Sequence, residues 1–304
     1  MPLIVTGSIG IDTIHTPRAK AEGILGGSCA YFAAAASFHV PVRILAAVGG
    51  DWPDAHRQVL QRFDNISLDG LETRPQSKTF AWGGRYFDNM NQRETLFTEL
   101  GVLDEDLPPL PEHYRDSEYV FLANTHPANQ TALAGQFPSR KLAVADTMDL
   151  WINIAQPELL QMLAGVDGLV LNDAEAQQLT EINNAVSAAR KILDMGPTFV
   201  VVKKGEHGAV LVHRDGLATI PAYPSEHHQV VDPTGAGDAF AGGMMGHIAA
   251  VGMTDFASIQ TALAWGTVTA SFVIESFGLN RLTEISRRDI DERMREFQGL
   301  ARVG

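Results

Sequence analysis

The chain has 304 residues, of which 45% are hydrophobic and 19% are charged, a balance that supports a packed core and argues against wholesale disorder. The formal net charge of −13 argues against nucleic acid or an anionic membrane as the main partner. The single cysteine, Cys29, excludes an intramolecular disulfide, and the lack of a long apolar run or a signal-like start predicts a cytoplasmic protein.

Short apolar, β-branched runs alternate with helix-like segments along most of the chain. Six runs are typical of buried strands, at 3–7, 42–49, 119–124, 141–146, 168–172 and 198–203. Between them the pattern predicts helices at about 26–38, 52–63, 127–136, 155–164, 173–180 and 184–195. This alternation predicts one α/β domain over residues 1–304, with a central, mostly parallel sheet and helices on both faces.

Two regions depart from the alternation. Residues 73–100 read as polar-apolar strands without a helix, and we expect them, with part of 10–20, to form a small projecting β-sheet, called the lid here. Residues 205–231 contain "AVLVH" and "LATIP" joined by "RDG", which predicts a hairpin. Its neighbouring His227 and His228 are not expected to share a metal. Further on, helices are predicted near 235–251, 254–275 and 286–298.

The segment "DPTGAGDAF" (232–240) places glycines at the start of a predicted helix. Glycines allow a sharp turn and a close approach by an anion, and the free N–H groups of a helix's first turn attract phosphate. A carboxylate there, Asp238, could take a proton from an attacking hydroxyl while the amides stabilise a transferred phosphoryl group. The alternative is a glycine-rich turn with an acidic helix cap.

The longer segment "DPTGAGDAFAGG" resembles the C-terminal signature of the ribokinase-like (PfkB) carbohydrate kinase family, and residues 26–51 resemble that family's di-glycine signature. The order and spacing agree, so the resemblance covers nearly the whole chain. It implies a ribokinase-like fold and transfer of the γ-phosphate of ATP, with Mg²⁺, to a primary hydroxyl of a small molecule. By this match Asp238 is the catalytic base, the amides of Ala236, Gly237 and Asp238 form the anion hole, and Gly235 belongs to the same catalytic turn.

The resemblance also implies residues on the nucleotide side. In "NDAEA", Asn172 and Glu175 match a motif that positions Mg²⁺ and phosphate through water, and magnesium does favour oxygen ligands and retained waters. The alternative interpretation of these two residues is a helix start with its cap.

In "VVKKGEHGA", Gly205 and Gly208 are expected beside the nucleotide. Neighbouring strand residues face opposite ways, so only one of Lys203 and Lys204 should reach phosphate, and Lys204 is assigned to ATP.

Residues 269–282 resemble the segment that closes over adenine, and this assigns Gly278 to the ATP site together with Thr234. In relatives the Asp and Thr of the main motif, with backbone carbonyls, can hold a monovalent cation. Asp232 and Thr234 match that pair, which leaves a K⁺ site open.

The acceptor side is predicted from Asp12 and from the glycine pair Gly26 and Gly27. A carboxylate can accept hydrogen bonds from two hydroxyls, and glycines leave room for a ring. Tyr31 stands where the family often has Asn, and this departure speaks against ribose as the acceptor. We expect Trp82 of the lid to cover the acceptor, with a homodimer interface through the lid as the alternative.

The sequence therefore predicts an ATP-dependent kinase of a sugar or sugar-like molecule. An adenosine-type nucleoside kinase is the first alternative, because the aromatic residues of the lid would also suit stacking on a purine, and a vitamin kinase is the next. A dehydrogenase is disfavoured because Phe240 stands where a dinucleotide fingerprint needs its third glycine. A regulator without catalysis is disfavoured by the presence of Asp238.

Overall fold

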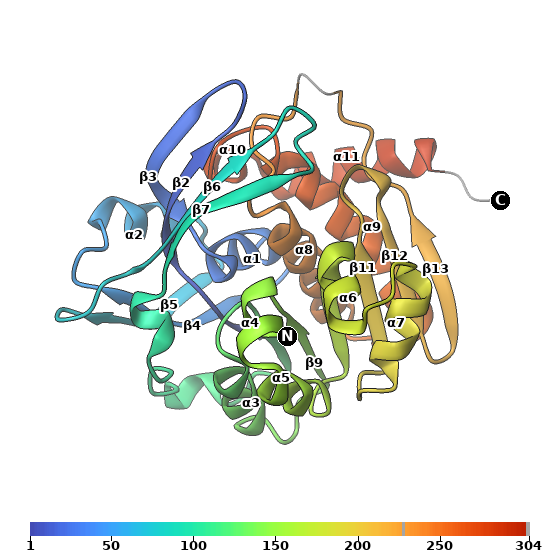
Figure 1. Ribbon diagram of the computed structural model, residues 1–304, viewed down its shortest axis with the longest axis horizontal. Coiled ribbons are helices and arrows are strands. Elements are labelled where there is room, and N and C mark those ends of the chain that lie inside the picture. The colour runs from blue at the N-terminus through green and yellow to red at the C-terminus, as the bar shows by residue number, and fades with distance from the viewer. Residues whose placement is uncertain (227–228, 302–304) are drawn as a thin grey trace.

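The computed structural model describes residues 1–226 and 229–301, and the predictions for His227 and His228 lie outside them. Within these residues the main sheet has nine strands in the order β13-β12-β11-β10-β9-β8-β1-β4-β5 (Figure 1). Their bounds are β1 Leu3–Thr6, β4 Val42–Gly49, β5 Ile66–Arg74, β8 Tyr119–Leu122, β9 Leu142–Asp146, β10 Gly168–Asn172, β11 Phe199–Lys203, β12 Ala209–His213 and β13 Gly216–Ile220. The strands from β5 to β11 pair in parallel, and β12 and β13 add an antiparallel edge.

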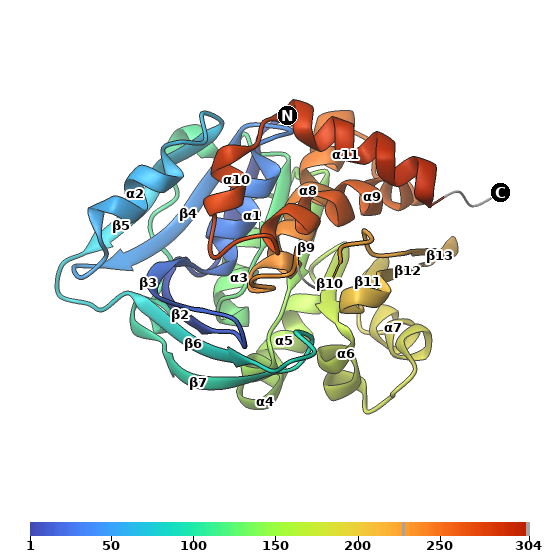
Figure 2. The same cartoon turned by 90° about the horizontal axis from the view of Figure 1, so that it is seen from above.

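Helices cover both faces of this sheet (Figure 2). One face carries α1 Ser28–Ala36, α2 Asp54–Leu60, α8 Ala236–Val251, α9 Phe256–Val273, α10 Asn280–Glu284 and α11 Arg287–Leu300. The other carries α3 Pro127–Gly135, α4 Asp149–Ile154, α5 Gln156–Leu163, α6 Asp173–Thr180 and α7 Ala185–Leu193. Consecutive strand residues pack on opposite faces, as Ile4 and Val5 of β1 do. Both faces are therefore buried, as in a doubly wound α/β fold.

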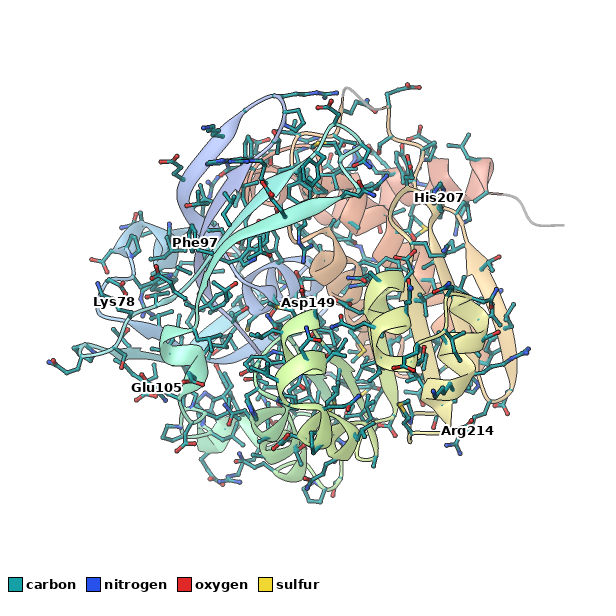
Figure 3. The ribbon with its side chains drawn as sticks, in the orientation of Figure 1. Lys78, Phe97, Glu105, Asp149, His207 and Arg214 are labelled. Carbon is teal, nitrogen blue, oxygen red and sulfur yellow. The ribbon has the colours of Figure 1, made fainter. Side chains whose placement is uncertain are left out.

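The lid is a second sheet that lies beyond the carboxyl ends of the main strands (Figure 2). Its strands are ordered β3-β2-β6-β7, with bounds β2 Gly10–His15, β3 Lys20–Gly26, β6 Phe80–Tyr86 and β7 Arg93–Glu99. An apolar cluster that includes Ile14, Phe80 and Trp82 from the lid and Trp151 from α4 joins it to the body. The outer strand β7 is exposed along its length, and Phe97 lies on it (Figure 3).

The small residues of α8 let this helix pack very close to its neighbours. A Cβ on Gly242 would overlap the backbone carbonyl of Phe32 in α1, and one on Gly243 would lie 2.8 Å from the carbonyl oxygen of Trp265 in α9. Glycines are required at such approaches. The packing holds α8 between α1 and α9 and so fixes where its N-terminus points.

Most predicted elements are confirmed: the six strands are β1, β4, β8, β9, β10 and β11, and the α/β fold follows from them. Three differences stand out. Residues 66–74 form β5 in the main sheet, so the lid strand of this stretch begins at Phe80 and not near 73. The lid's other half extends to Gly26, and the short helices α4 and α10 were not predicted. In the described part of the chain, no helix is both long and apolar enough to cross a membrane.

Candidate active site

Three neighbouring strands of the main sheet end in polar residues, next to the helix α8 that covers one face of the sheet. Asp146 ends β9, Asn172 ends β10 and Lys203 ends β11, and Asn172 and Lys203 are paired in register. The residues two and four positions before Asp146 and Lys203 pack in the same core as α8, so these two side chains continue on that face. The carboxyl ends of the strands, the start of α8 and the lid therefore enclose one site.

The turn before α8 needs its glycine. Gly235 has φ +75, in the left-handed region, and a Cβ there would overlap the ring of Tyr31. Tyr31 is 1% exposed and lies directly under the turn, and its hydroxyl has no hydrogen-bond partner among the described residues. Burial, and then the charge of Asp232, raises the pKa of Tyr31 well above its usual value. Tyr31 thus supports the turn, and its contact with an acceptor stays a prediction.

Asp238 lies in the first turn of α8, as expected, and has a second carboxyl group beside it. Burial raises its pKa, while the charges of Lys203 and Arg93 and a hydrogen bond with Asp146 act to lower it. Asp146 is 5% exposed, and its own pKa lies well above the usual value because of burial and the charge of Asp238. This arrangement favours a neutral Asp146 that donates a hydrogen bond to an ionised Asp238.

Asn172 and Glu175 form a capping box at the start of α6. The Asn172 Oδ1 accepts from the backbone N–H of Glu175 at 2.8 Å, and Glu175 Oε2 accepts from that of Asn172 at 2.8 Å. The helix-start interpretation is therefore confirmed. The role of these residues in binding Mg²⁺ and phosphate stays a prediction. Burial raises the pKa of Glu175, and the nearby charge of Lys203 acts to lower it.

This corner fits a magnesium ion in its chemistry. Asp146 keeps a buried carboxylate oxygen, Oδ1, without a hydrogen-bond partner in the part of the chain described, and Glu175 adds a second carboxyl. In residues 1–226 and 229–301 no three His, Cys, Asp or Glu side chains are grouped to hold a metal by themselves. That donor set suits Mg²⁺, which keeps several waters and uses phosphate oxygens as ligands.

The expected nucleotide loop follows β11 as a short 3-10 turn, Gly205–His207. Gly205 and Gly208 have φ +54 and +86, and a Cβ on Gly208 would overlap the carbonyl oxygen of Ile220 on β13. Lys204 Nζ lies 3.4 Å from Asp173 Oδ2, at the start of α6. Its contact with ATP stays a prediction.

The lid reaches this loop. Asn91, in the turn between β6 and β7, donates from Nδ2 to Glu206 Oε1 at 2.8 Å. At the foot of the same turn, the guanidinium of Arg93 lies 5.3 Å from the centre of the Trp82 ring. Trp82 is 8% exposed and packs inside the lid, against Gly84, whose Cβ would overlap its ring. Its predicted contact with an acceptor remains a prediction, as does a dimer through the lid.

The di-glycine segment makes room for Asp12. A Cβ on Gly26 would overlap the Asp12 carboxylate, and Gly27, at φ +94, donates its backbone N–H to that carboxylate. Asp12 is 3% exposed, and its Oδ1 has no partner in the described residues. Burial and the charges of Asp232 and Asp238 raise its pKa to about 8. The structure thus brings Asp12, Gly26 and Gly27 together, and one oxygen of the Asp12 carboxyl group has no donor among the described residues.

Asp232 lies under the turn at Gly235 that precedes α8, and it is fully buried. Its Oδ1 accepts from the backbone N–H of Thr234 at 2.9 Å, and the N–H of Gly278 also donates to it. Its Oδ2 has no partner in the stretch of chain described, and burial raises its pKa to about 6. The Thr234 hydroxyl donates to the Tyr86 hydroxyl at 3.2 Å, which ties this motif to the lid.

Sequence reasoning missed Asp146 and Arg93 and did not choose Lys203. Asp146 could have been found, since it ends a predicted parallel strand, where ligands of such sheets bind. Arg93 carries no such signal, because its place depends on how the lid folds back over the body.

Known proteins resemble this chain in sequence and in fold. The model of the pfkB family carbohydrate kinases matches residues 124–285. A cytidine kinase from Thermococcus kodakarensis is 29% identical over 81% of this chain and 87% of its own length. A ribokinase from Lactococcus lactis is 27% identical over 93% of this chain and 95% of its own.

Two solved structures have the same fold. The nucleoside kinase of Methanocaldococcus jannaschii has a TM-score of 0.76 at 21% identity and covers 97% of this chain and 98% of its own. A putative ribokinase II from E. coli, solved with ATP and Mg²⁺, has a TM-score of 0.76 at 17% identity, with 97% and 99% covered. Since the family match spans more than half of the sequence, the chain belongs to the pfkB family of carbohydrate kinases and is a phosphotransferase.

Proposed function

We propose that the chain transfers the γ-phosphate of ATP to a primary hydroxyl of a sugar or sugar-like molecule, with Asp238 as the base. The observation that carries this proposal is a carboxylate in the first turn of α8, directly after the left-handed turn at Gly235. The acceptor oxygen gives its proton to Asp238 and forms a bond to the γ-phosphorus. The bond from that phosphorus to the bridging oxygen breaks, and its electron pair leaves with ADP.

The residues around Asp238 have separate tasks in this proposal. The backbone N–H groups that begin with Ala236 and Gly237 stabilise the charge on the phosphoryl oxygens. Asp146 holds the Asp238 carboxylate in place and keeps it ionised through its hydrogen bond. Glu175 would hold Mg²⁺ through water, and the ion would neutralise phosphate charge when bound.

The nucleotide would lie along the ends of β10 and β11. Asn172, Gly205 and Gly208 border its phosphates in this proposal, and Lys204 adds a positive charge. Thr234 and Gly278 border it from the opposite side. Support comes from the place of these residues, because Asn172 ends β10 and the loop with Gly205 and Gly208 directly follows β11, at the carboxyl ends of parallel strands.

The acceptor would present its hydroxyls to Asp12, whose carboxyl group fits against the backbone only because residue 26 is glycine. A buried carboxyl oxygen without a donor is costly, so a ligand that supplies hydroxyl donors should bind there. A nucleoside is the second candidate, because its ribose carries the same hydroxyls and the cytidine kinase relative covers most of the chain.

Two further parts of the proposal rest on single features. The buried, unpartnered Oδ2 of Asp232, in the described part of the chain, supports a K⁺ site, which predicts higher activity in potassium chloride than in tetramethylammonium chloride. Leu96 and Phe97, each 38% exposed on the outer lid strand, support a homodimer through the lid. Sedimentation of the wild-type protein tests the dimer directly.

The experiment for the main proposal is an acceptor screen. ADP release and product formation are measured with ATP and Mg²⁺ over pentoses, hexoses, nucleosides and vitamins, with Asp238→Asn as the matched control. We expect one chemical class to be phosphorylated by the wild type and not by the variant. Product formed equally by Asp238→Asn would show that another group is the base, and transfer to no hydroxyl would contradict the proposed function.

A further inference from the structure

The two consecutive lysines at the end of β11 point in different directions. Phe199 and Val201 pack in the core that contains α8, whereas Val200 and Val202 pack in the core on the opposite face. Lys203 therefore continues on the α8 side. Its Nζ lies 2.6 Å from the position that a Cβ on Gly237 would take, directly over the first turn of α8.

Lys203 has charged neighbours on three elements but forms no ion pair with any residue that the structure describes. Its charge acts on Asp238 of α8, on Asp146 of β9 and on Glu175 of α6. Even so, no described carboxylate oxygen lies within 4.0 Å of its Nζ, whereas Lys204 meets Asp173 at 3.4 Å. The Lys203 ammonium thus lies close to the predicted anion hole, without a direct anionic partner in residues 1–226 and 229–301.

We propose, on the basis of the proposed function, that Lys203 is a catalytic residue whose ammonium contacts the transferred phosphoryl group. In the transfer step the new bond to the acceptor oxygen forms while the bond to the ADP oxygen breaks. Negative charge then lies on the three remaining phosphoryl oxygens. The Lys203 ammonium lies beside Gly237 in the first turn of α8, so it and the amides of that turn stabilise this charge together in the proposal.

The position of Lys203 also reduces an electrostatic repulsion at the site. The carboxyl groups of Asp238 and Glu175 would repel a triphosphate that approaches the base. A cation between them and the phosphate weakens this repulsion where the dielectric constant is low. Arg93 of the lid adds a second positive charge to the same two carboxyl groups. Lys203 differs from Arg93 because it comes from the main sheet, whereas Arg93 comes from the lid.

The test compares Lys203→Met with Lys204→Met and with a control, Lys141→Met, whose lysine pairs with Glu118 at the opposite end of the sheet. We expect Lys203→Met to lower kcat about 10²–10³-fold, as for other donors to a developing oxyanion. Lys204→Met should change mainly the KM for ATP, and Lys141→Met should change neither constant.

A binding measurement separates this role from a structural one. In thermal melts, the non-hydrolysable ATP analogue AMP-PNP should stabilise the wild type more than ADP does, and Lys203→Met should remove that difference. A further variant, Lys203→Cys, can be treated with 2-bromoethylamine, which rebuilds an ammonium at the same distance. The natural Cys29 is fully buried and should not react.

The outcomes are distinguishable. Recovery of activity after this treatment supports the inference, even if Lys203→Met folds poorly. A folded Lys203→Met with wild-type kcat, or a treated cysteine variant that folds but does not recover, overturns it. If the wild type transfers phosphate to no acceptor, the proposed function fails. The AMP-PNP comparison still decides whether Lys203 contacts the terminal phosphate.

Discussion

Replacing Asp12 with Asn should make the unliganded protein more stable and a poorer kinase. Asp12 is 3% exposed, and burial together with the charges of Asp232 and Asp238 raises its pKa from 3.8 to about 8. Asn keeps the shape of the side chain and an oxygen that accepts from Gly27, but it cannot ionise. The substitution therefore removes the charge that the fold opposes and leaves the neighbouring packing in place.

The size of the effect follows from linkage between protonation and folding. The unfolded chain loses the Asp12 proton near pH 3.8, whereas the folded protein keeps it until about pH 8. The stability from this group is thus fully present below pH 3.8 and is lost as the pH rises toward 8. Since each pH unit corresponds to about 1.4 kcal/mol, the total loss is on the order of 5 kcal/mol. Burying an amide offsets part of the gain, so we expect Asp12→Asn to be about 2–4 kcal/mol more stable at pH 8.

Urea unfolding at pH 8, 6 and 4.5 tests this reasoning. The free energy of unfolding of the variant should exceed that of the wild type at pH 8, and the difference should shrink as the pH falls. In kinetic assays the KM for the acceptor should rise about 10–100-fold, with little change in the KM for ATP. A variant that is less stable than the wild type at pH 8 would refute the argument. Equal damage to both KM values would instead indicate a collapse of lid strand β2, which carries Asp12.

Three other substitutions test the site. Asp238→Asn should lower kcat by about 10²–10⁴-fold while calorimetry shows nearly unchanged nucleotide affinity, and wild-type turnover would remove it from the base role. Gly237→Val should lower the rate of phosphoryl transfer more than it lowers the melting temperature, because the added Cβ meets only the flexible end of Lys203. Unfolding as the main effect would show that Gly237 serves the fold and not the reaction. Trp82→Ala should raise the acceptor KM and the fraction of ATP hydrolysed without product. If this variant instead sediments as monomers with its coupling intact, Trp82 serves a dimer interface.

The main sheet could be predicted because its central strands are buried on both faces. A run such as that of β11, with every residue apolar up to Lys203, occurs in parallel strands covered by helices. The edge strand β5 was missed for the opposite reason. Its residues 66–74 mix exposed and buried positions around Gly70, and this pattern cannot be told from that of a lid strand. Helix α4 has only six residues, too few for a helical period to repeat.

The candidate site was predictable where the chemistry lies in a local motif. The turn before α8 and the glycine pair at the end of β3 each carry their own signal, because a left-handed φ or a close approach demands glycine. The choice between Lys203 and Lys204 was beyond sequence reasoning. A strand that is buried on both faces has no polar alternation, so nothing in residues 199–202 reveals which face the next side chain takes.

The buried carboxyl groups between the lid and the carboxyl ends of the main strands support the proposal of a ligand site there. Five of them, Asp12, Asp146, Glu175, Asp232 and Asp238, have a raised pKa, and burial is the largest cause in each case. Carboxyl groups that oppose their own environment lower the stability of the empty protein at neutral pH. Ligands that supply hydroxyl donors or cations remove part of this unfavourable free energy. The groups that lower the stability of the empty protein therefore strengthen ligand binding.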